Sequence, residues 1–358
     1  MLDQAADIRK GEELDQAKLE AYLQQQKAGF STLKAIKQFP GGYSNLTYLL
    51  ETDRGEYVLR RPPFGANIKT AHDMSREFRV LSALEGIYDK IPRPLLYCED
   101  ETVIGAPFYI MERVKGVILR GALYKKIDLG PGLMRAISEA AVDNLAALHS
   151  IDIEATGLAS MGKPEGYISR QVEGWTKRYY KAETDTVQSM NELAGWMEKN
   201  QPRDSRAGLI HNDYKYDNLV LQEGQLSRIL AVLDWEMATV GDPLMDLGTS
   251  LAYWTEPPEA QMMPLAAGNL TWLPGNLSRA EVVERYTAQS RREARNILFF
   301  YVYGTFKIGV IAQQIYARYR KGHTKDERFA GLIEAVRFFG LLGQKALEKD
   351  KISGLLTK

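Results

Sequence analysis

Residues 211–218, together with Asp234 further along the chain, have the types and spacing that can do chemistry. The pattern His-x-Asp-x-x-x-x-Asn sets the carboxylate of Asp213 shortly before the amide of Asn218, and Asp234 follows in the motif VLDWE. Phosphoryl transfer requires such parts, because one group must orient the nucleophile and oxygen ligands must hold magnesium against the phosphates. We therefore expect Asp213 to be the base or orienter of an acceptor hydroxyl, and Asn218 and Asp234 to ligate magnesium.

The segment between Asn218 and Asp234 contains the element that would bring these two residues together. Two apolar runs flank Glu223-Gly224-Gln225, which is typical of a β-hairpin with Asn218 before its first strand and Asp234 after its second. A lone His-x-Asp or Leu-Asp-Trp is more often an ordinary turn or strand end. The spacing, the hairpin and the second aspartate together favour the functional interpretation.

The segments HNDYKYDN, VLDWEMATVGDPLMDLG and LAALH resemble the aminoglycoside phosphotransferase and choline kinase superfamily, which are small-molecule kinases. The resemblance extends over about residues 39–340. VLRRPP, AHDMSREFRVL and IAQQIYARYRKG are most similar to the phosphotransferase domains that occur fused to acyl-CoA dehydrogenases and as stand-alone bacterial proteins. That subgroup is associated with phosphorylation of hydroxyacyl-CoA thioesters.

The resemblance implies an α+β, two-lobed protein-kinase-like fold. A small N-terminal lobe with an antiparallel sheet would comprise residues 1–115, of which 1–28 would form a leading helix, and a larger, mainly helical lobe would comprise 116–358. The first lobe would bind the nucleotide and the second would carry the catalytic residues and the acceptor. The implied activity is transfer of the γ-phosphate of ATP, with Mg²⁺, to a hydroxyl of a small molecule.

Two predicted strands, YLLET and EYVLR, follow a loop that contains a glycine pair. Such a loop can lie over nucleotide phosphates and donate backbone N–H groups where a Cβ would obstruct their approach. A Gly-Gly pair alone is weak evidence, and the catalytic pattern downstream strengthens it. The loop residues expected to contact the nucleotide are Gly41, Gly42, Ser44 and Asn45.

The strand EYVLR ends on Arg60, where a protein kinase carries the lysine of its Val-Ala-Ile-Lys motif. Arginine grips phosphate bidentately but is larger than lysine, so Arg60 is the first candidate for the phosphate contact and Arg61 the second. Glu77, in a helix predicted to begin near Asp73, takes the place of the kinase glutamate that pairs with this cation. The alternative is that Glu77 is a solvated helix residue. By the same resemblance, backbone groups near Glu112 and Val114 form a hinge against the adenine edge.

Four further residues have supporting or less certain roles. Lys215 matches a protein-kinase lysine that reaches the transferring phosphate, and the alternative is a surface lysine. Asp246 opens a predicted helix, where its carboxylate would accept backbone N–H bonds from the catalytic loop. His211 is expected to support the site without touching the reactants. His149 ends another predicted helix and is expected to be a cap or packing residue.

The composition excludes some partners. The chain has 358 residues, 45% of them apolar, and 46 basic residues balance 46 acidic ones. No net field therefore favours nucleic acid or an anionic membrane. The sequence has neither a signal-peptide core nor a membrane-length apolar run, and its single cysteine, Cys98, cannot form an intrachain disulfide, so we expect a cytoplasmic protein.

Several alternatives stay open. The acceptor could instead be an aminoglycoside or a choline-like amino alcohol, and the sequence indicates neither the acceptor nor an oligomeric state. A nucleotide-binding pseudokinase is a rival, since Arg60 departs from lysine, although Asp213, Asn218 and Asp234 argue against it. A metallohydrolase is disfavoured because the four histidines show no paired ligand spacing. Residues 256–277, interrupted by Pro and Gly, are a candidate lid near the acceptor.

Overall fold

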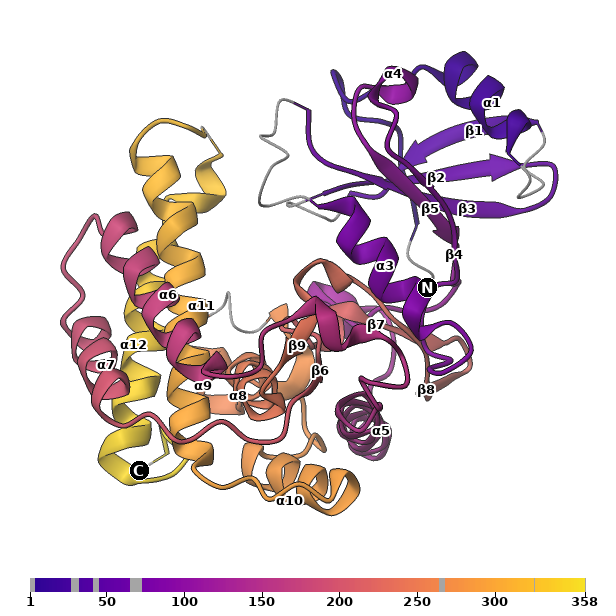
Figure 1. Ribbon diagram of the computed structural model, residues 1–358. Coiled ribbons are helices and arrows are strands. Elements are labelled where there is room, and N and C mark those ends of the chain that lie inside the picture. Colours follow the sequence, from indigo (N-terminus) through magenta and orange to yellow (C-terminus); the bar gives the residue numbers. More distant parts are fainter. Residues whose placement is uncertain are drawn as a thin grey trace. The chain divides into compact units, whose positions relative to one another are not determined.

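The computed structural model describes most of the chain (Figure 1). The described residues are 4–26, 32–40, 45–64, 73–263, 268–324 and 326–357. The chain divides into two compact units, called here the sheet unit and the helical unit. The sheet unit consists of Met1–Ile118 and Leu219–Ala238, and the helical unit of Leu119–Asn218 and Thr239–Lys358.

The sheet unit is built on a five-stranded antiparallel sheet in the order β1-β2-β3-β5-β4. Its strands are β1 (Leu33–Gln38), β2 (Leu46–Thr52), β3 (Glu56–Arg61), β4 (Pro94–Cys98) and β5 (Phe108–Glu112). Helix α1 (Gln16–Gln25) packs Leu19 and Leu23 into the core that contains Leu59 of β3. Because successive side chains of a strand point to opposite faces, Arg60 lies on the other face of the sheet.

Three further elements complete the sheet unit. Asp73 caps helix α3 (Met74–Leu84), as predicted, by accepting from the N–H of Arg76, and α4 (Glu101–Ile104) is a single turn. The predicted hairpin is present as β7 (Leu219–Gln222) and β8 (Gln225–Val232). Its turn contains Gly224 at φ +81°, a conformation that glycine adopts without strain. Leu219, the residue after Asn218, pairs with Val232, two residues before Asp234.

The helical unit consists of eight helices and one small strand pair among its described residues (Figure 1). The helices are α5 (Pro131–His149), α6 (Tyr167–Ala182), α7 (Gln188–Lys199), α8 (Pro243–Tyr253), α9 (Pro257–Met262), α10 (Arg279–Ser290), α11 (Ile297–Arg320) and α12 (Leu332–Lys349). The strands β6 (Gly208–Ile210) and β9 (Thr239–Gly241) pair antiparallel and flank the catalytic segment and hairpin in the sequence.

Helix α11 is the core of this unit and packs against α8, α12 and α6. It approaches α8 backbone to backbone, because a Cβ at Gly248 would lie 2.1 Å from the carbonyl oxygen of Phe300, and one at Gly304 would lie 2.2 Å from that of Gly248. The largely apolar residues 297–320 therefore form a helix that is buried along most of its length. Within the described ranges, no helix is both long and apolar enough to span a membrane.

The segment 256–277 differs from the predicted loop. Pro257 and Pro258 occupy the first positions of α9, where a missing N–H costs nothing, and Glu256 and Glu259 form a capping box. Proline thus begins a helix here instead of interrupting one. A second capping box, formed by Ser278 and Glu281, begins α10.

Candidate active site

The catalytic segment begins where β6 ends, and Asp246 on α8 holds its first turn. The N–H of His211 donates to Asp246 Oδ2 at 2.6 Å, and the N–H of Asn212 donates to Oδ1 at 2.8 Å. Burial would raise the pKa of the Asp246 carboxyl, but the ring of His149 and these N–H groups hold it below its ordinary value. The prediction that Asp246 accepts backbone bonds from this segment is confirmed.

The two histidines of this region are both fully buried. His149 Nε2 lies 3.1 Å from Asp246 Oδ2, and its Nδ1 lies 2.7 Å from the hydroxyl of Tyr286. Since the Asp246 carboxylate only accepts, Nε2 carries the proton and Nδ1 accepts from the tyrosine. His211 Nδ1 accepts from the N–H of Asp213 at 3.3 Å, so its ring stabilises the turn. His149 is thus the predicted packing residue.

Asp213, Lys215 and Asn218 lie together in the helical unit. Lys215 Nζ is 3.0 Å from Asp213 Oδ2, and Asn218 Nδ2 donates at 2.9 Å to both Oδ2 and the backbone oxygen of Asp213. Because the nitrogen of the Asn218 amide points at Asp213, its Oδ1 points away from it and has the donor chemistry of a magnesium ligand. Burial would lower the pKa of Lys215, but the neighbouring Asp213 carboxylate raises it well above its ordinary value, so it is an ammonium.

Tyr253, at the end of α8, is a site residue that sequence reasoning missed. Lys215 Nζ lies 4.7 Å from the centroid of its ring. Burial, followed by the charge of the Asp213 carboxylate, raises the pKa of the Tyr253 hydroxyl, so it stays protonated. A tyrosine at the end of an apolar helix looks like a packing residue, and no local pattern marks it.

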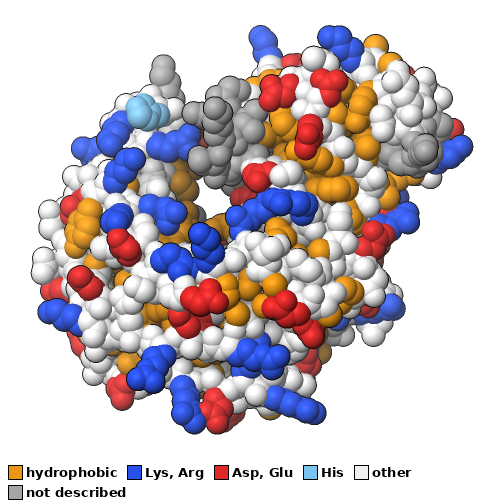
Figure 2. All heavy atoms as spheres, in the orientation of Figure 1, with side chains coloured by type: hydrophobic (Ala, Val, Ile, Leu, Met, Phe, Trp, Pro, Cys, Tyr) orange, Lys and Arg blue, Asp and Glu red, His pale blue; other side chains and the backbone are white. Residues whose placement is uncertain are grey.

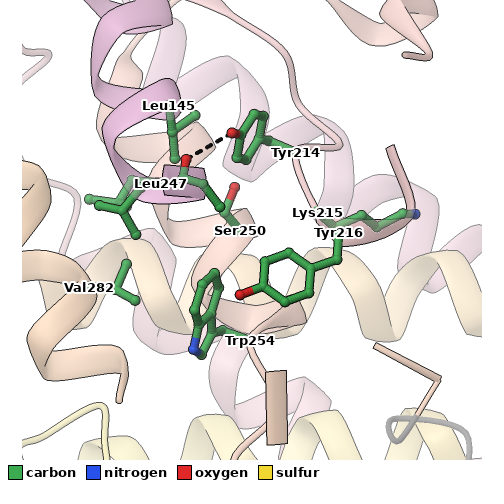
Figure 3. A pocket seen from close by; sticks show the side chains of 10 residues that line it. Leu145, Tyr214, Lys215, Tyr216, Leu247, Ser250, Trp254 and Val282 are labelled. Carbon is green, nitrogen blue, oxygen red and sulfur yellow. Dashed lines mark hydrogen bonds between the residues drawn. The ribbon is translucent and has the colours of Figure 1, made fainter. Parts of the chain in front are cut away.

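Alternate residues of the catalytic segment anchor it to the helices. Figure 3 shows Tyr214 and Tyr216 directed into an apolar pocket that also contains Trp254, whereas Lys215 between them extends away from it. The Tyr214 hydroxyl donates to the carbonyl of Ala141 at 2.8 Å. The pattern Tyr-Lys-Tyr therefore buries two rings under the segment and leaves the cation on the side of Asp213.

A cavity of about 290 Å³ borders Lys215 and Asp217 in the helical unit. Its lining residues come from the segment before α5, the catalytic segment, the end of α8 and the residues just after it, the segment after α9, and helices α11 and α12. They are Gly121, Lys215, Asp217, Ala252, Tyr253, Thr255, Met263, Gly268, Asn269, Ile308, Ala335 and Phe339. One ammonium and one carboxyl group thus face a largely uncharged, partly apolar wall.

Arg60 is the centre of a charged cluster in the sheet unit. Its guanidinium lies 3.0 Å from Glu77 Oε1, 2.9 Å from Asp234 Oδ1 and 3.6 Å from Glu236 Oε2, and its side chain is only 9% exposed. Burial would lower the pKa of Arg60, but the surrounding carboxylates, Glu77 first, raise it well above its ordinary value. Glu77 also accepts from the N–H of Trp235 at 3.1 Å, so it is a buried partner of the cation rather than a solvated residue.

Glu236 is a second residue that sequence reasoning missed. Its Oε2 accepts from Asn45 Nδ2 at 2.5 Å, which joins the residue after the glycine loop to the acidic motif. The signal was present, because Glu236 follows Asp234 in VLDWE, but its partners are distant in sequence. Asp234 itself has a left-handed φ of +68°, which turns the chain sharply after the hairpin.

Of the other predicted nucleotide contacts, the structure describes some and not others. Arg61 donates to the carbonyls of Pro62 and Ile104 and is 1% exposed, so it stabilises the backbone and Arg60 is the better phosphate candidate. The N–H of Glu112 donates to the carbonyl of Arg93 at 2.9 Å, which restricts any adenine contact there to the Glu112 carbonyl. Val114 packs against the hairpin core. The predicted contacts Gly41, Gly42 and Ser44 lie outside the described residues.

Comparison with protein families gives a match to the phosphotransferase enzyme family over residues 35–282. The chain is 36% identical over 348 residues to human acyl-CoA dehydrogenase family member 11, which covers 94% of this chain and 44% of the human protein. It is 39% identical over 249 residues to mouse acyl-CoA dehydrogenase family member 10, covering 69% of this chain and 23% of that protein. The chain thus spans less than half the length of these relatives.

Among solved structures, a Ralstonia eutropha protein described provisionally as an aminoglycoside phosphotransferase is 31% identical, with a TM-score of 0.78 and coverage of 94% of this chain and 99% of that one. A variant of aminoglycoside phosphotransferase APH(4)-Ia in complex with ADP and hygromycin B has a TM-score of 0.56 at 18% identity, over 90% of this chain and 98% of that one, and this likeness concerns the fold alone. The predicted α+β, protein-kinase-like fold is confirmed. The chain belongs to the phosphotransferase enzyme family.

Proposed function

We propose that the protein transfers the γ-phosphate of ATP, with Mg²⁺, to a hydroxyl of a small molecule. The observation that carries the proposal is the cluster of Asp213, Lys215 and Asn218. In the sequence a β-hairpin follows this cluster directly, and Asp234 lies two residues after the second strand of the hairpin. Phosphoryl transfer of this kind depends on positioning and charge neutralisation more than on covalent chemistry. A segment held by buried hydrogen bonds supplies the positioning.

In this proposal Asp213 orients the acceptor hydroxyl and receives its proton. Lys215, an ammonium held 3.0 Å from Asp213, is available to the transferring phosphate. Asn218 donates to the Asp213 carboxylate and Lys215 pairs with it, so its oxygens keep one direction before the substrate binds. Asn218 Oδ1 and the carboxylate of Asp234 are oxygen donors of the kind that magnesium prefers, and the bound ion would neutralise charge on the phosphates.

We assign nucleotide binding to the first lobe, about residues 1–115. Arg60 is proposed to grip phosphate oxygens, with Glu77 fixing its direction. Asn45 and the preceding glycine loop would cover the phosphates, and the Glu112 carbonyl and Val114 N–H would meet the adenine edge. Crystallised family neighbours with ADP and with AMP-PNP support an adenine nucleotide.

The acceptor that we favour is a hydroxyacyl-CoA thioester. The cavity beside Lys215 has apolar walls, including Ile308, Ala335 and Phe339, that suit an acyl chain. Basic side chains gather at the exposed end of α11, where they could meet CoA phosphates (Figure 2). They are Arg318, Arg320 and Lys321, beside His323. The names of the relatives, acyl-CoA dehydrogenase family members, also favour an acyl-CoA compound.

An aminoglycoside is the second candidate acceptor, because family neighbours are aminoglycoside phosphotransferases. Such a polycation needs several carboxylates around it, whereas Asp217 is the one acidic residue among the lining residues described for this cavity. A choline-like amino alcohol meets the same objection. A regulatory pseudokinase is a different candidate, since Arg60 is paired with Asp234, a proposed magnesium ligand.

The test incubates the protein with Mg-ATP and a panel of hydroxyacyl-CoA thioesters, aminoglycosides and amino alcohols, and follows the mass of each acceptor. Asp213→Asn is the matched control, because it removes the carboxylate charge and keeps the shape of the side chain. A phosphate-sized mass gain on one class, absent with the control, establishes the activity and the acceptor class together.

Two other outcomes decide against parts of the proposal. Turnover by Asp213→Asn equal to that of the wild type contradicts the role of Asp213. Nucleotide binding without ADP formation on any acceptor favours the pseudokinase, and capture of partner proteins then becomes the next experiment.

A further inference from the structure

Lys307 is a buried lysine in the middle of α11. Lys307 is only 2% exposed, and its Nζ donates to the backbone oxygen of Asn212 at 2.9 Å. The ring of Trp175 lies 5.7 Å from the same nitrogen. Burying an ammonium is costly, so a lysine in this position needs interactions that compensate for the loss of water.

The residue that Lys307 contacts has an unusual backbone. Asn212 has φ +67°, a left-handed conformation that residues other than glycine seldom adopt, and it directly precedes Asp213. Its N–H donates to Asp246 Oδ1 at 2.8 Å. The same residue is thus held on its N–H side by a buried carboxylate and on its C=O side by a buried ammonium.

We propose that Lys307 is a positioning residue for Asp213. Lys307 and Asp246 together hold Asn212 from its two sides, an arrangement called here the clamp, and this fixes the direction in which the Asp213 side chain leaves the turn. The carbonyl of Asn212 belongs to the peptide that joins it to Asp213. A rotation of that peptide would swing the Asp213 side chain directly. The inference rests on the proposed function, in which Asp213 orients the acceptor hydroxyl.

The charge of Lys307 can be tested through pH. Burial lowers its pKa to about 8, and Asp246 on α8 and Asp213 on the catalytic segment oppose that shift. Lys215 and Arg178 of α6 face it as like charges and lower it slightly further. With this pKa, Lys307 is mostly an ammonium at pH 7, half of it is neutral at pH 8, and most of it is neutral at pH 9. The clamp therefore weakens in the alkaline range.

The experiment compares Lys307→Met with Gln313→Met. Methionine keeps most of the lysine chain and removes the ammonium. Gln313 is a matched control, because it is also buried on α11, but it donates to the carbonyl of Ala182 and the hydroxyl of Thr184. Loss of a charge-assisted hydrogen bond that acts on a reacting group lowers turnover by about tenfold to one-hundredfold.

Two readouts are used on the full chain: ADP formation from Mg-ATP, and amide hydrogen exchange of the peptide covering residues 209–218. Lys307→Met should lower turnover without changing the KM for ATP, should speed exchange of this peptide, and should lose the alkaline decline near pH 8. Gln313→Met should show none of these changes. A folded Lys307→Met protein with wild-type turnover, exchange and pH profile overturns the proposal.

The remaining outcomes are also decisive. If Lys307→Met does not fold, wild-type exchange corrected for its intrinsic pH dependence is compared at pH 7 and 9. Loss of protection at pH 9 in this peptide supports the clamp, and constant protection overturns it. Asp213→Asn separates the two hypotheses: wild-type turnover there rejects the proposed function, whereas an inactive Asp213→Asn beside an unchanged Lys307→Met rejects the clamp alone.

Discussion

Asp246→Asn should damage both stability and turnover, because one side chain satisfies two buried backbone donors. Oδ2 accepts from His211 and Oδ1 from Asn212. An asparagine offers one oxygen and one NH₂ group, so in either orientation one of these N–H groups faces another donor. His149 can adapt by exchanging its tautomer, since Tyr286 can accept as well as donate, but the backbone cannot.

The expected loss of stability follows from the one backbone N–H group that the asparagine leaves without an acceptor. An unsatisfied buried N–H costs about 1–3 kcal/mol, and the surviving bond loses its charge assistance, so the free energy of unfolding should fall by about 2–5 kcal/mol. Urea unfolding of the wild type and the variant measures it. Asp143→Asn is the control, because Asp143 is 40% exposed in its ion pair with Arg285 and should change stability by less than about 1 kcal/mol.

The difference should also depend on pH. The folded pKa of Asp246 lies below its ordinary value, so its contribution is complete above about pH 4 and is lost as the pH falls through the lowered value. The gap between the wild type and Asp246→Asn should be constant from pH 7 to pH 5 and shrink below pH 4. A variant as stable as the wild type, or a gap of constant size in acid, would refute this reasoning.

Three other substitutions test separate parts of the structure. Arg60→Met leaves the buried Glu77 carboxylate without its cation and should lower the free energy of unfolding, measured in urea, by about 3–5 kcal/mol; an unchanged value would mean that Glu77 is neutral. Gly248→Ala sets a Cβ against the carbonyl oxygen of Phe300 and should cost about 1–3 kcal/mol, seen as a lower melting temperature, unless the helices can separate freely. Tyr253→Phe removes only the hydroxyl whose pKa the Asp213 charge raises, so turnover should fall about tenfold while the melting temperature stays nearly constant; equal turnover would contradict a role for this hydroxyl in the site.

The local parts of this site could be predicted from the sequence. The hairpin between Asn218 and Asp234 is readable because its turn and both strands are contiguous, and the structure has it where expected. Asp246 could be assigned because an aspartate at the start of a helix, just after the motif, has backbone donors within reach. Short-range spacing thus determines the catalytic segment and its first support.

The remaining contacts depend on packing between distant segments. Lys307 and Tyr253 lie in apolar helices. From the sequence alone, their polar groups look the same as those of residues that pack in the core or extend their polar ends to the surface. Only the packing of the helices shows what these polar groups contact. Glu236 lies two residues after a predicted ligand, Asp234, but its importance comes from its contacts with Arg60 and Asn45. No periodicity or motif encodes those distances.

The glycine contact between α8 and α11 has a consequence for how turnover tolerates change. Asp246 lies shortly before Gly248 on one helix, and Lys307 shortly after Gly304 on the other, so the spacing of this crossing also sets the span between the two charges that hold Asn212. A remote substitution that separates the two helices by a fraction of an ångström would lengthen the hydrogen bonds of Asp246 and Lys307 to Asn212 while the protein stays folded. Selection for thermal stability alone would not detect such a variant, whereas selection for turnover would.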